Sequence, residues 1–329
     1  MVKVAVVGSD RWNQQRVEWL KSFSSVNVST VVDEGGVEGQ SLNYERAVVQ
    51  VMEEVDAMVL SVPSDQCWPL LAVLAPFDKP ILLDKPQGLN VEEAKELYHL
   101  VQQFGNRVTV GRQWRWLPEF QEMKRCLTAG DIGKALCYVG IRRYGTRGPM
   151  SEGQGFRRIW SEIGLDDVEL ALWFLGEAVD WVEAVETGGW ISGSLPSADV
   201  QESVGVIHFC SGALGYLACG RLAWRGVDIR SEIWGESGAL AAEFSHASEV
   251  VRIDELGQTV VGYQDYSEVL TMAMREETKT WLQSVIAGSP PLVSMEEMWK
   301  ALQVTSALNE SVQSGTRVYM KITDQGQDT

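Results

Sequence analysis

The chain has 329 residues, of which 45% are hydrophobic and 22% charged, and its formal net charge is −17 at pH 7. This length exceeds one ordinary domain and suits two, each with its own core. An anionic surface of this kind repels nucleic-acid phosphates and anionic lipid headgroups, which argues against nucleic acid and membranes as partners.

The N-terminus enters a strand-like run, VKVAVVG, directly, without a charged stretch followed by an apolar signal core. The five cysteines form no CxxC pair and the three histidines are scattered, so we expect no metal site. The cysteines are expected to be small buried side chains in a reducing compartment. Together these features predict a soluble, cytoplasmic protein.

Apolar strands alternate with helices through the first third of the chain. In chain order we expect strands at 2–7, 26–32, 57–62, 80–83 and 107–110, with helices at 13–23, 44–54, 66–75 and 91–104 between them. Such alternation predicts an α/β domain of the Rossmann type, with a doubly wound parallel sheet. This first domain is expected to span residues 1–112.

The remaining residues, 113–329, follow another pattern. A helix at 118–129, a strand at 135–144 and a helix at 162–175 precede a series of strand-like runs, and two helices close the chain at 267–287 and 295–313. The runs lie near 180–187, 202–209, 214–223, 229–234, 238–244, 248–253 and 258–263. Consecutive strands predict an α+β domain with a large, mostly antiparallel sheet and helices on one face. The other face would be covered by a second subunit, in a dimer or tetramer.

The turn after the first strand is the first candidate ligand site. It follows a strand and opens a helix, whose N-terminus attracts anions such as a diphosphate. A dinucleotide turn has glycine at three positions, and here only Gly8 is present. Asp10 adds a carboxylate and Arg11 a compensating charge, with Trp12 next to them. The turn is therefore either a cofactor site or an ordinary turn that has lost its ligand.

Two further candidates follow later strands. Asp33 ends the second strand, where a carboxylate hydrogen-bonds an adenosine ribose and favours NAD over NADP, although an ordinary loop aspartate fits equally well. Lys85 follows the buried run ILL and Asp84, at the strand ends where ligands bind in parallel sheets. Partial burial would lower the pKa of this amine toward a useful acid–base range, and Asp84 would partly oppose that shift.

Several segments resemble the glucose–fructose oxidoreductase, inositol dehydrogenase and rhizopine catabolism (Gfo/Idh/MocA) family. Residues 84–90, DKPQGLN, resemble its glutamate-lysine-proline element. Four further matches follow in chain order: Ser61-Val62-Pro63, GRQWRWLP at 111–118, TAGDIGKAL at 128–136 and LWFLGE at 172–177. The resemblance covers nearly the whole chain and implies hydride transfer between NAD or NADP and a sugar, polyol or related small molecule, with Ser61, Pro63 and Lys85 beside the cofactor.

In this family a lysine matching Lys85 is joined by an aspartate and a histidine four residues apart on a helix. The matching positions here are Glu162 and Asp166. A histidine titrates near pH 6.5, whereas an aspartate titrates near about 3.9 and is a weak base unless it is buried or crowded by like charge. The two carboxyl groups would assist Lys85, pair with nearby basic residues, or form a solvated acidic helix start.

Candidate substrate contacts follow the fifth strand. Trp114 and Trp116 would place both indoles on one side if the segment is extended, and would then stack on a sugar ring or a nicotinamide. Packing between domains is the alternative. Arg115 matches the family element, and Arg143 on the next strand would bind an anionic group of the substrate or form internal ion pairs.

Three hypotheses follow. The first is an NAD(P)-dependent oxidoreductase in which Lys85 is the main acid–base group. The second is a non-catalytic binding or regulatory homologue, because the turn lacks two glycines and the helix lacks its histidine. The third keeps the fold and uses the acidic helix for an elimination or hydrolysis, for which the sequence gives no positive sign.

Overall fold

The computed structural model describes residues 1–8, 11–32, 44–62, 64–84, 91–103, 107–144, 159–187, 202–221, 223, 227–245, 250–254, 257–261 and 266–320. The chain forms two compact units. The first unit contains Met1–Trp116 and Met272–Lys300, and the second contains Leu117–Thr271 and Ala301–Thr329. The two units are described separately.

The first unit contains a five-stranded parallel sheet with the order β2-β1-β3-β4-β5. This sheet confirms the predicted doubly wound α/β domain. Its strands are β1 (Val2–Val7), β2 (Val26–Val32), β3 (Ala57–Leu60), β4 (Ile81–Leu83) and β5 (Val108–Val110). Its helices are α1 (Arg11–Ser22), α2 (Tyr44–Glu54), α3 (Ser64–Leu74), η1 (Ala75–Phe77), α4 (Val91–Gln103) and η2 (Gln113–Trp116).

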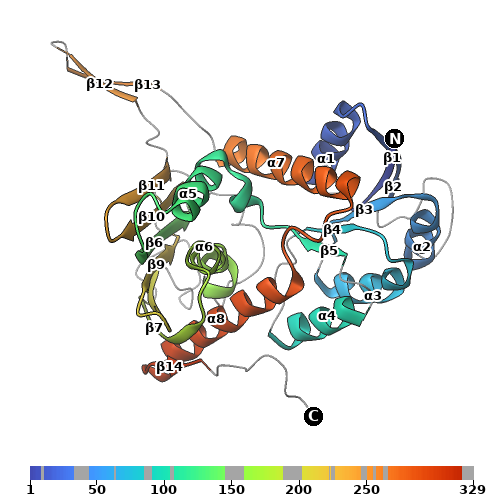
Figure 1. Cartoon of the computed structure of the whole chain (residues 1–329). Coiled ribbons are helices and arrows are strands. Elements are labelled where there is room, and N and C mark those ends of the chain that lie inside the picture. The colour runs from blue at the N-terminus through green and yellow to red at the C-terminus, as the bar shows by residue number, and fades with distance from the viewer. Residues whose placement is uncertain are drawn as a thin grey trace, which may run out of the picture. The chain divides into compact units, whose positions relative to one another are not determined.

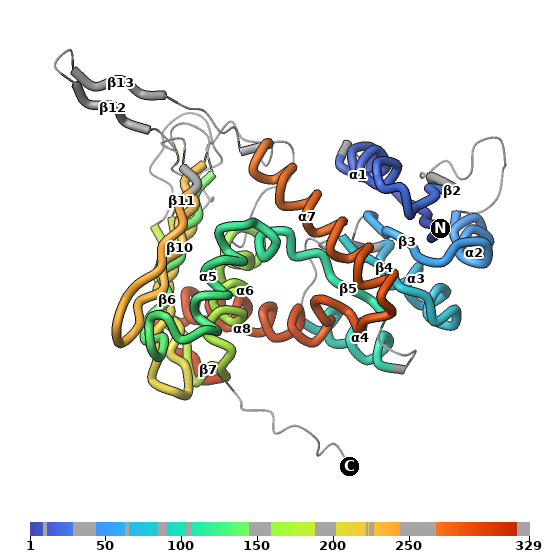
Figure 2. Tube along the Cα trace, turned by 45° about the horizontal axis from the view of Figure 1, so that its top comes forward, coloured from blue at the N-terminus to red at the C-terminus, as the bar shows by residue number. Residues whose placement is uncertain are grey.

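Helices cover both faces of this sheet (Figure 1). On one face, α1 and the final residues of α7 (Tyr266–Ala287) pack against the strands, and Trp281 and Leu282 join Val4, Val6 and Leu20 in one core cluster. On the other face lie α2, α3 and α4 (Figure 2). The central strands are buried throughout, which explains why they appear in the sequence as continuous apolar runs.

The second unit contains a seven-stranded sheet with the order β11-β10-β6-β9-β8-β7-β14. Only the β6–β9 pairing is parallel, so the predicted mostly antiparallel sheet is confirmed. The strands are β6 (Ala135–Tyr144), β7 (Val179–Thr187), β8 (Glu202–Phe209), β9 (Leu214–Gly220), β10 (Val227–Gly235), β11 (Ala239–Ser245) and β14 (Val318–Tyr319). The helices that begin or end in this unit are α5 (Pro118–Ala129), η3 (Trp160–Gly164), α6 (Leu165–Leu175), α7 and α8 (Met295–Ser314).

Burial alternates along the strands of this sheet, so its two faces differ. Tyr138, Ile229 and Ile207 are fully buried on the face covered by α6 and by the part of α8 that belongs to this unit. The opposite face keeps Val185 67% exposed and Tyr216 43% exposed. We call this second surface the open sheet face.

Four details differ from the sequence-based expectations. Residues 113–116 form a 3₁₀ helix instead of an extended segment, so alternation does not bring the two indoles to one side. The helix expected from Glu162 begins as a π-helical turn, η3, before α6. The strands β12 (Val250–Asp254) and β13 (Gly257–Val261) pair with each other in a separate sheet. Cys210 is exposed, whereas Cys67 and Cys219 are buried as expected.

Candidate functional site

Gly8 ends β1 with φ of +122°, a backbone conformation that side-chain-bearing residues rarely adopt. A Cβ atom at this position would collide with the carbonyl oxygen of Ser61 and with the side-chain amide of Asn13. The glycine is therefore required by both conformation and space. We call this packing of Gly8 against Ser61 and Asn13 the cradle; it fits the role of the first glycine in a dinucleotide turn, which is the tight turn after the strand.

Asn13 occupies the sequence position of the third glycine in the dinucleotide pattern. Its side chain is 1% exposed, and its Nδ2 donates to the carbonyl oxygen of Ser61 at 3.5 Å. Asn13 thus packs the first turn of α1 against the end of β3, the close packing that a glycine at this position otherwise permits.

The ends of four parallel strands form one edge of the sheet, which we call the carboxyl edge. Backbone hydrogen bonds continue the ladder to this edge, from Ser61 to Val7 and from Asp84 to Leu60, with Gly111 donating to Leu83. The chain order reverses between β1 and β3, and ligands bind at the carboxyl ends beside such a switch point. The cradle at Gly8 lies at this point.

A buried ionic network adjoins the carboxyl edge. Arg16 of α1 is fully buried and donates from Nη1 to Asp84 Oδ2 at 2.8 Å and from Nη2 to Asp84 Oδ1 at 3.2 Å. Its Nη2 also donates to Glu277 Oε2, on α7, at 3.3 Å. Ser61 Oγ donates to Asp84 Oδ2 at 2.9 Å. One guanidinium therefore joins α1, the end of β4 and α7.

Glu277 is the interior carboxyl group of this network. It is 1% exposed and accepts the backbone N–H of Arg112 at its Oε1, at 2.5 Å. The pKa of Glu277 is raised to about 7. Burial is the main cause and the nearby charge of Asp84 adds to the rise, whereas Arg16 acts to lower the pKa. Glu277 consequently changes charge near neutral pH.

Only part of the predicted cofactor set falls within the described residues. Gly8 and Ser61 lie together at the carboxyl edge, and Trp12 is partly buried in α1. For Arg11 the structure describes the backbone, as the first residue of α1. The predicted residues Asp10, Asp33, Pro63 and Lys85 lie outside the described residues.

The segment after β5 holds three of the predicted substrate contacts. Trp114 is 2% exposed and Arg115 5%, while Trp116 is intermediate. Arg115 Nη1 donates to Glu297 Oε1 at 2.9 Å. Burial would raise the pKa of Glu297, but the charge of Arg115 and the hydrogen bonds of Ser294 hold it below its usual value. Arg115 is thus fixed by an ion pair within the first unit.

The acidic helix of the second unit is buried. Glu162 lies in the π-helical turn η3 with intermediate exposure, and Asp166 is 6% exposed in the first turn of α6. Asp167 accepts two hydrogen bonds from Arg142, at 3.0 and 3.1 Å, and both side chains are almost completely buried. The alternative of a solvated acidic helix start is therefore wrong for Asp166 and Asp167, because both are buried and Asp167 pairs with β6.

Arg143 points to the other side of β6, since strand neighbours face opposite ways. Its guanidinium donates to Glu202 Oε1 at 2.6 Å and to Asp228 Oδ2 at 3.2 Å, on the open sheet face. These ion pairs match the second of the two roles expected for it. A substrate-binding role for Arg143 stays a prediction.

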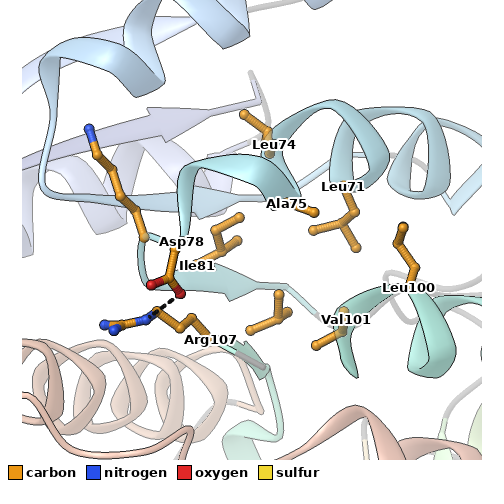
Figure 3. Close-up of a pocket in the computed structure, with 10 residues that line it drawn as sticks. Leu71, Leu74, Ala75, Asp78, Ile81, Leu100, Val101 and Arg107 are labelled. Carbon is orange, nitrogen blue, oxygen red and sulfur yellow. Dashed lines mark hydrogen bonds and ion pairs between the residues drawn. The ribbon is translucent and has the colours of Figure 1, made fainter. Parts of the chain in front are cut away.

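A shallow pocket lies at the opposite, amino edge of the parallel sheet (Figure 3). Leu71, Leu74, Leu100 and Val101 line it, with the Asp78–Arg107 ion pair at its rim. It begins before β4 and β5, whereas ligands of parallel sheets bind after the strands. We therefore place no function there.

The described residues contain no metal-binding cluster and no membrane-spanning helix. Within those ranges, no three His, Cys, Asp or Glu side chains are grouped so that they could hold a metal ion. In the same part of the chain, every helix is too short or too polar to cross a membrane.

The parallel sheet with a glycine cradle at its switch point, in a chain with a second α+β unit, defines a two-part dinucleotide-binding class of enzyme. Residues 2–112 match the oxidoreductase family with an NAD-binding Rossmann fold, and residues 120–241 match the GFO/IDH/MocA C-terminal domain. The chain belongs to the Gfo/Idh/MocA oxidoreductase family, and its first domain matches the NAD-binding Rossmann fold of that family. The resemblance seen in the sequence is confirmed.

Characterised relatives and solved structures agree with this assignment. The chain is 28% identical to myo-inositol 2-dehydrogenase of Thermotoga maritima over 81% of this chain and 80% of that protein. It is 25% identical to scyllo-inositol 2-dehydrogenase (NAD(+)) of Bacillus subtilis, over 83% and 80%. The fold matches a probable dehydrogenase from Thermotoga maritima with a TM-score of 0.84, at 24% identity, covering 97% of this chain and 98% of that one.

Sequence reasoning missed the buried network. Arg16 and Glu277 are 261 positions apart, and nothing local to either residue shows that they meet. A charged residue on the apolar side of the first helix was the one available signal, because such residues are buried only when paired.

Proposed function

We propose that this oxidoreductase oxidises a polyol of the inositol type, or reduces the corresponding ketone, with NAD as the cofactor. The cradle at Gly8, on the switch point of the parallel sheet, is the observation that carries the proposal. The relatives named as inositol dehydrogenases support the substrate class. Bound NAD would accept or return the hydride.

The residues proposed to hold the cofactor surround the carboxyl edge. Gly8 permits the tight turn after β1, and the N-terminus of α1 attracts an anion such as the diphosphate. Asp33, by accepting a hydrogen bond from a ribose hydroxyl, favours NAD over NADP. The full proposed set is Gly8, Asp10, Arg11, Trp12, Asp33, Ser61, Pro63 and Lys85.

We assign Lys85 as the main acid–base group and Asp166 and Glu162 as assisting groups. The place of Asp166 supports this role, because it lies buried in the first turn of α6 at the position of the family histidine. Arg115, Trp114, Trp116 and Arg143 are the proposed substrate contacts. Residues 1–112 are proposed as the dinucleotide-binding domain and 113–329 as the substrate-binding and oligomerisation domain.

The test is oxidation of myo-inositol and scyllo-inositol with NAD⁺ or NADP⁺, followed by nicotinamide absorbance. We expect turnover with NAD⁺ that exceeds turnover with NADP⁺, and a loss of at least about 100-fold in kcat for Lys85→Ala. Lys79→Ala is the matched control, because Lys79 binds the carbonyls at the end of α2, away from the carboxyl edge. Unchanged turnover of Lys85→Ala would remove Lys85 from the mechanism.

A non-catalytic binding protein is the second candidate function. Two observations favour it: Asn13 fills the position of a glycine, and Asp166 stands where the family has a histidine. In this case the protein would bind NADH or a polyol without turnover of any inositol. Binding with no turnover on a panel of polyols, under conditions in which a related dehydrogenase is active, would select it.

The open sheet face is proposed to bind a second copy of the chain, in a dimer or tetramer. Val185, Leu214 and Tyr216 are exposed on it, while its charged residues pair among themselves, as Arg143 does with Glu202. An apolar surface with its charges neutralised suits a self-complementary contact. Sedimentation of Tyr216→Lys should show a smaller assembly than the wild type. A small-molecule substrate and a cytoplasmic location belong to the same proposal.

A further inference from the structure

Glu277 lies far along the chain from the carboxyl edge, yet it contacts two of the elements that form the edge. Its Oε2 accepts from Arg16 of α1, and its Oε1 accepts from the backbone N–H of Arg112, directly after β5. Trp281 and Leu282, one turn further along α7, are buried in the core of the first unit. The carboxyl group is therefore presented from a fixed helix.

The contacts require an ionised carboxyl group at this place, the form that Glu277 has above about pH 7. Two donors, the Arg16 guanidinium and the Arg112 N–H, converge on its two oxygens. A glutamine offers one oxygen and one NH₂ group, so one of the two donors would face another donor. A buried donor that lacks an acceptor costs free energy. This cost favours a displacement of the donor, together with the element that carries it, toward another acceptor.

The effect of Glu277 extends through Arg16. The guanidinium that Glu277 holds also grips both oxygens of Asp84, and Asp84 accepts the hydroxyl proton of Ser61. Asp84 ends β4 and Ser61 ends β3. A displacement of Arg16 therefore reaches the ends of both strands, at the edge where the cofactor is proposed to bind.

We propose that Glu277 is a positioning residue for the carboxyl edge, acting directly on the Arg112 backbone and, through Arg16, on Asp84 and Ser61. The inference rests on the proposed function, since the edge is the proposed cofactor site. Glu277 does not touch the cofactor in this account. It fixes the groups that do.

The test compares Glu277→Gln with Glu276→Gln. Glu276 is the preceding residue on α7 and pairs at the surface with Lys279, so its variant removes the same charge outside the network. We expect the NADH dissociation constant, from quenching of tryptophan fluorescence at pH 8, to rise about tenfold in Glu277→Gln and to stay unchanged in Glu276→Gln. At pH 8 the melting temperature of Glu277→Gln should not fall, because removing a charge that burial disfavours offsets the hydrogen bond that is lost.

This split separates positioning from a structural role, which would lower the melting temperature and leave the affinity of the folded protein intact. An affinity of Glu277→Gln within twofold of the wild type would overturn the inference. If Glu277→Gln does not fold, Glu277→Asp, which keeps the carboxylate on a shorter side chain, is measured in its place.

A second measurement is independent of the cofactor. Amide hydrogen exchange of residues 81–84 and 108–112 should be faster in Glu277→Gln than in the wild type and in Glu276→Gln. Equal exchange in all three proteins would overturn the inference. If the wild type bound no NADH, the proposed function would fail, and the exchange rates alone would still decide the role of Glu277.

Discussion

Arg16 in the first unit and Arg142 in the second are both fully buried, and each donates to both oxygens of one aspartate. For Arg142 this aspartate is Asp167. Arg16 binds both oxygens of Asp84 and also Glu277. Burial raises the pKa of Glu277 to about 7, and the nearby charge of Asp84 adds to this rise, so the Arg16 network takes up a proton near neutral pH.

The two buried arginines therefore differ in their expected roles. The Arg142–Asp167 pair joins β6 to α6 and stays charged. Burial lowers the pKa of Arg142, but the charge of Asp167 and of neighbouring groups outweighs this effect, so the pKa lies well above its usual value. The Arg16 network adjoins the proposed cofactor edge and can change its charge. The first pair is expected to govern stability, and the second to govern the geometry of the edge.

The largest expected effect is on the Arg142–Asp167 pair. Asp167→Asn leaves the buried guanidinium without its counter-charge, and we expect the free energy of unfolding to fall by about 3–5 kcal/mol. Urea denaturation measures this loss. Glu122→Gln, which breaks an exposed pair with Arg125, is the control and should leave the free energy of unfolding unchanged. A loss below about 1 kcal/mol for Asp167→Asn would show that the pair is not structural.

The next effect concerns the pH dependence of stability. The pKa of Glu277 is raised from 4.5 to about 7 in the folded chain, so between these values the unfolded chain ionises while the folded chain holds the proton. Stability from this group is complete below pH 4.5 and falls as pH rises to about 7, by up to about 3 kcal/mol.

Denaturation of the wild type and of Glu277→Gln, at intervals from pH 4.5 to 8, isolates this contribution in their difference. Glu276→Gln should retain the wild-type slope. If the free energy of unfolding depended on pH in the same way for the wild type and Glu277→Gln, the raised pKa of Glu277 would be contradicted. The Arg16 network would then keep its charges, as the Arg142–Asp167 pair does.

The smallest effect is expected at an exposed pair. Asp78 and Arg107 lie 2.7 Å apart with side chains 59% and 49% exposed, so their attraction is screened by water. Asp78 has φ of +49°, a conformation that asparagine also adopts readily. Asp78→Asn should change the free energy of unfolding by less than about 0.5 kcal/mol in thermal denaturation. A loss comparable to that of Asp167→Asn would show that burial does not distinguish these pairs.

Much of the fold was predictable because its signals are local. The continuous apolar runs at 2–7 and 81–83 are buried parallel strands, and the strand at 135–144 and the helix at 118–129 have the predicted bounds. The 3₁₀ helix at 113–116 and the π-helical turn at 160–164 were not predictable, because packing rather than propensity selects these geometries.

The candidate site was predictable only where one residue has a distinctive backbone or family position. Gly8 and Ser61 were identified in the sequence, and the structure brings them together at the carboxyl edge. The Arg16–Glu277 contact was not identified, because it joins the first helix to a helix near the end of the chain. Burial of Asp166 likewise depends on the sheet beneath α6, which the sequence of the helix does not show.

The proposed function depends on binding of a nicotinamide dinucleotide at the carboxyl edge around Gly8 and Ser61. Calorimetric titration of the purified chain with NADH tests it most directly. The account predicts one saturable site per chain with a dissociation constant on the order of micromolar, a range typical of enzyme ligands. Absence of any binding heat up to millimolar NADH would contradict it.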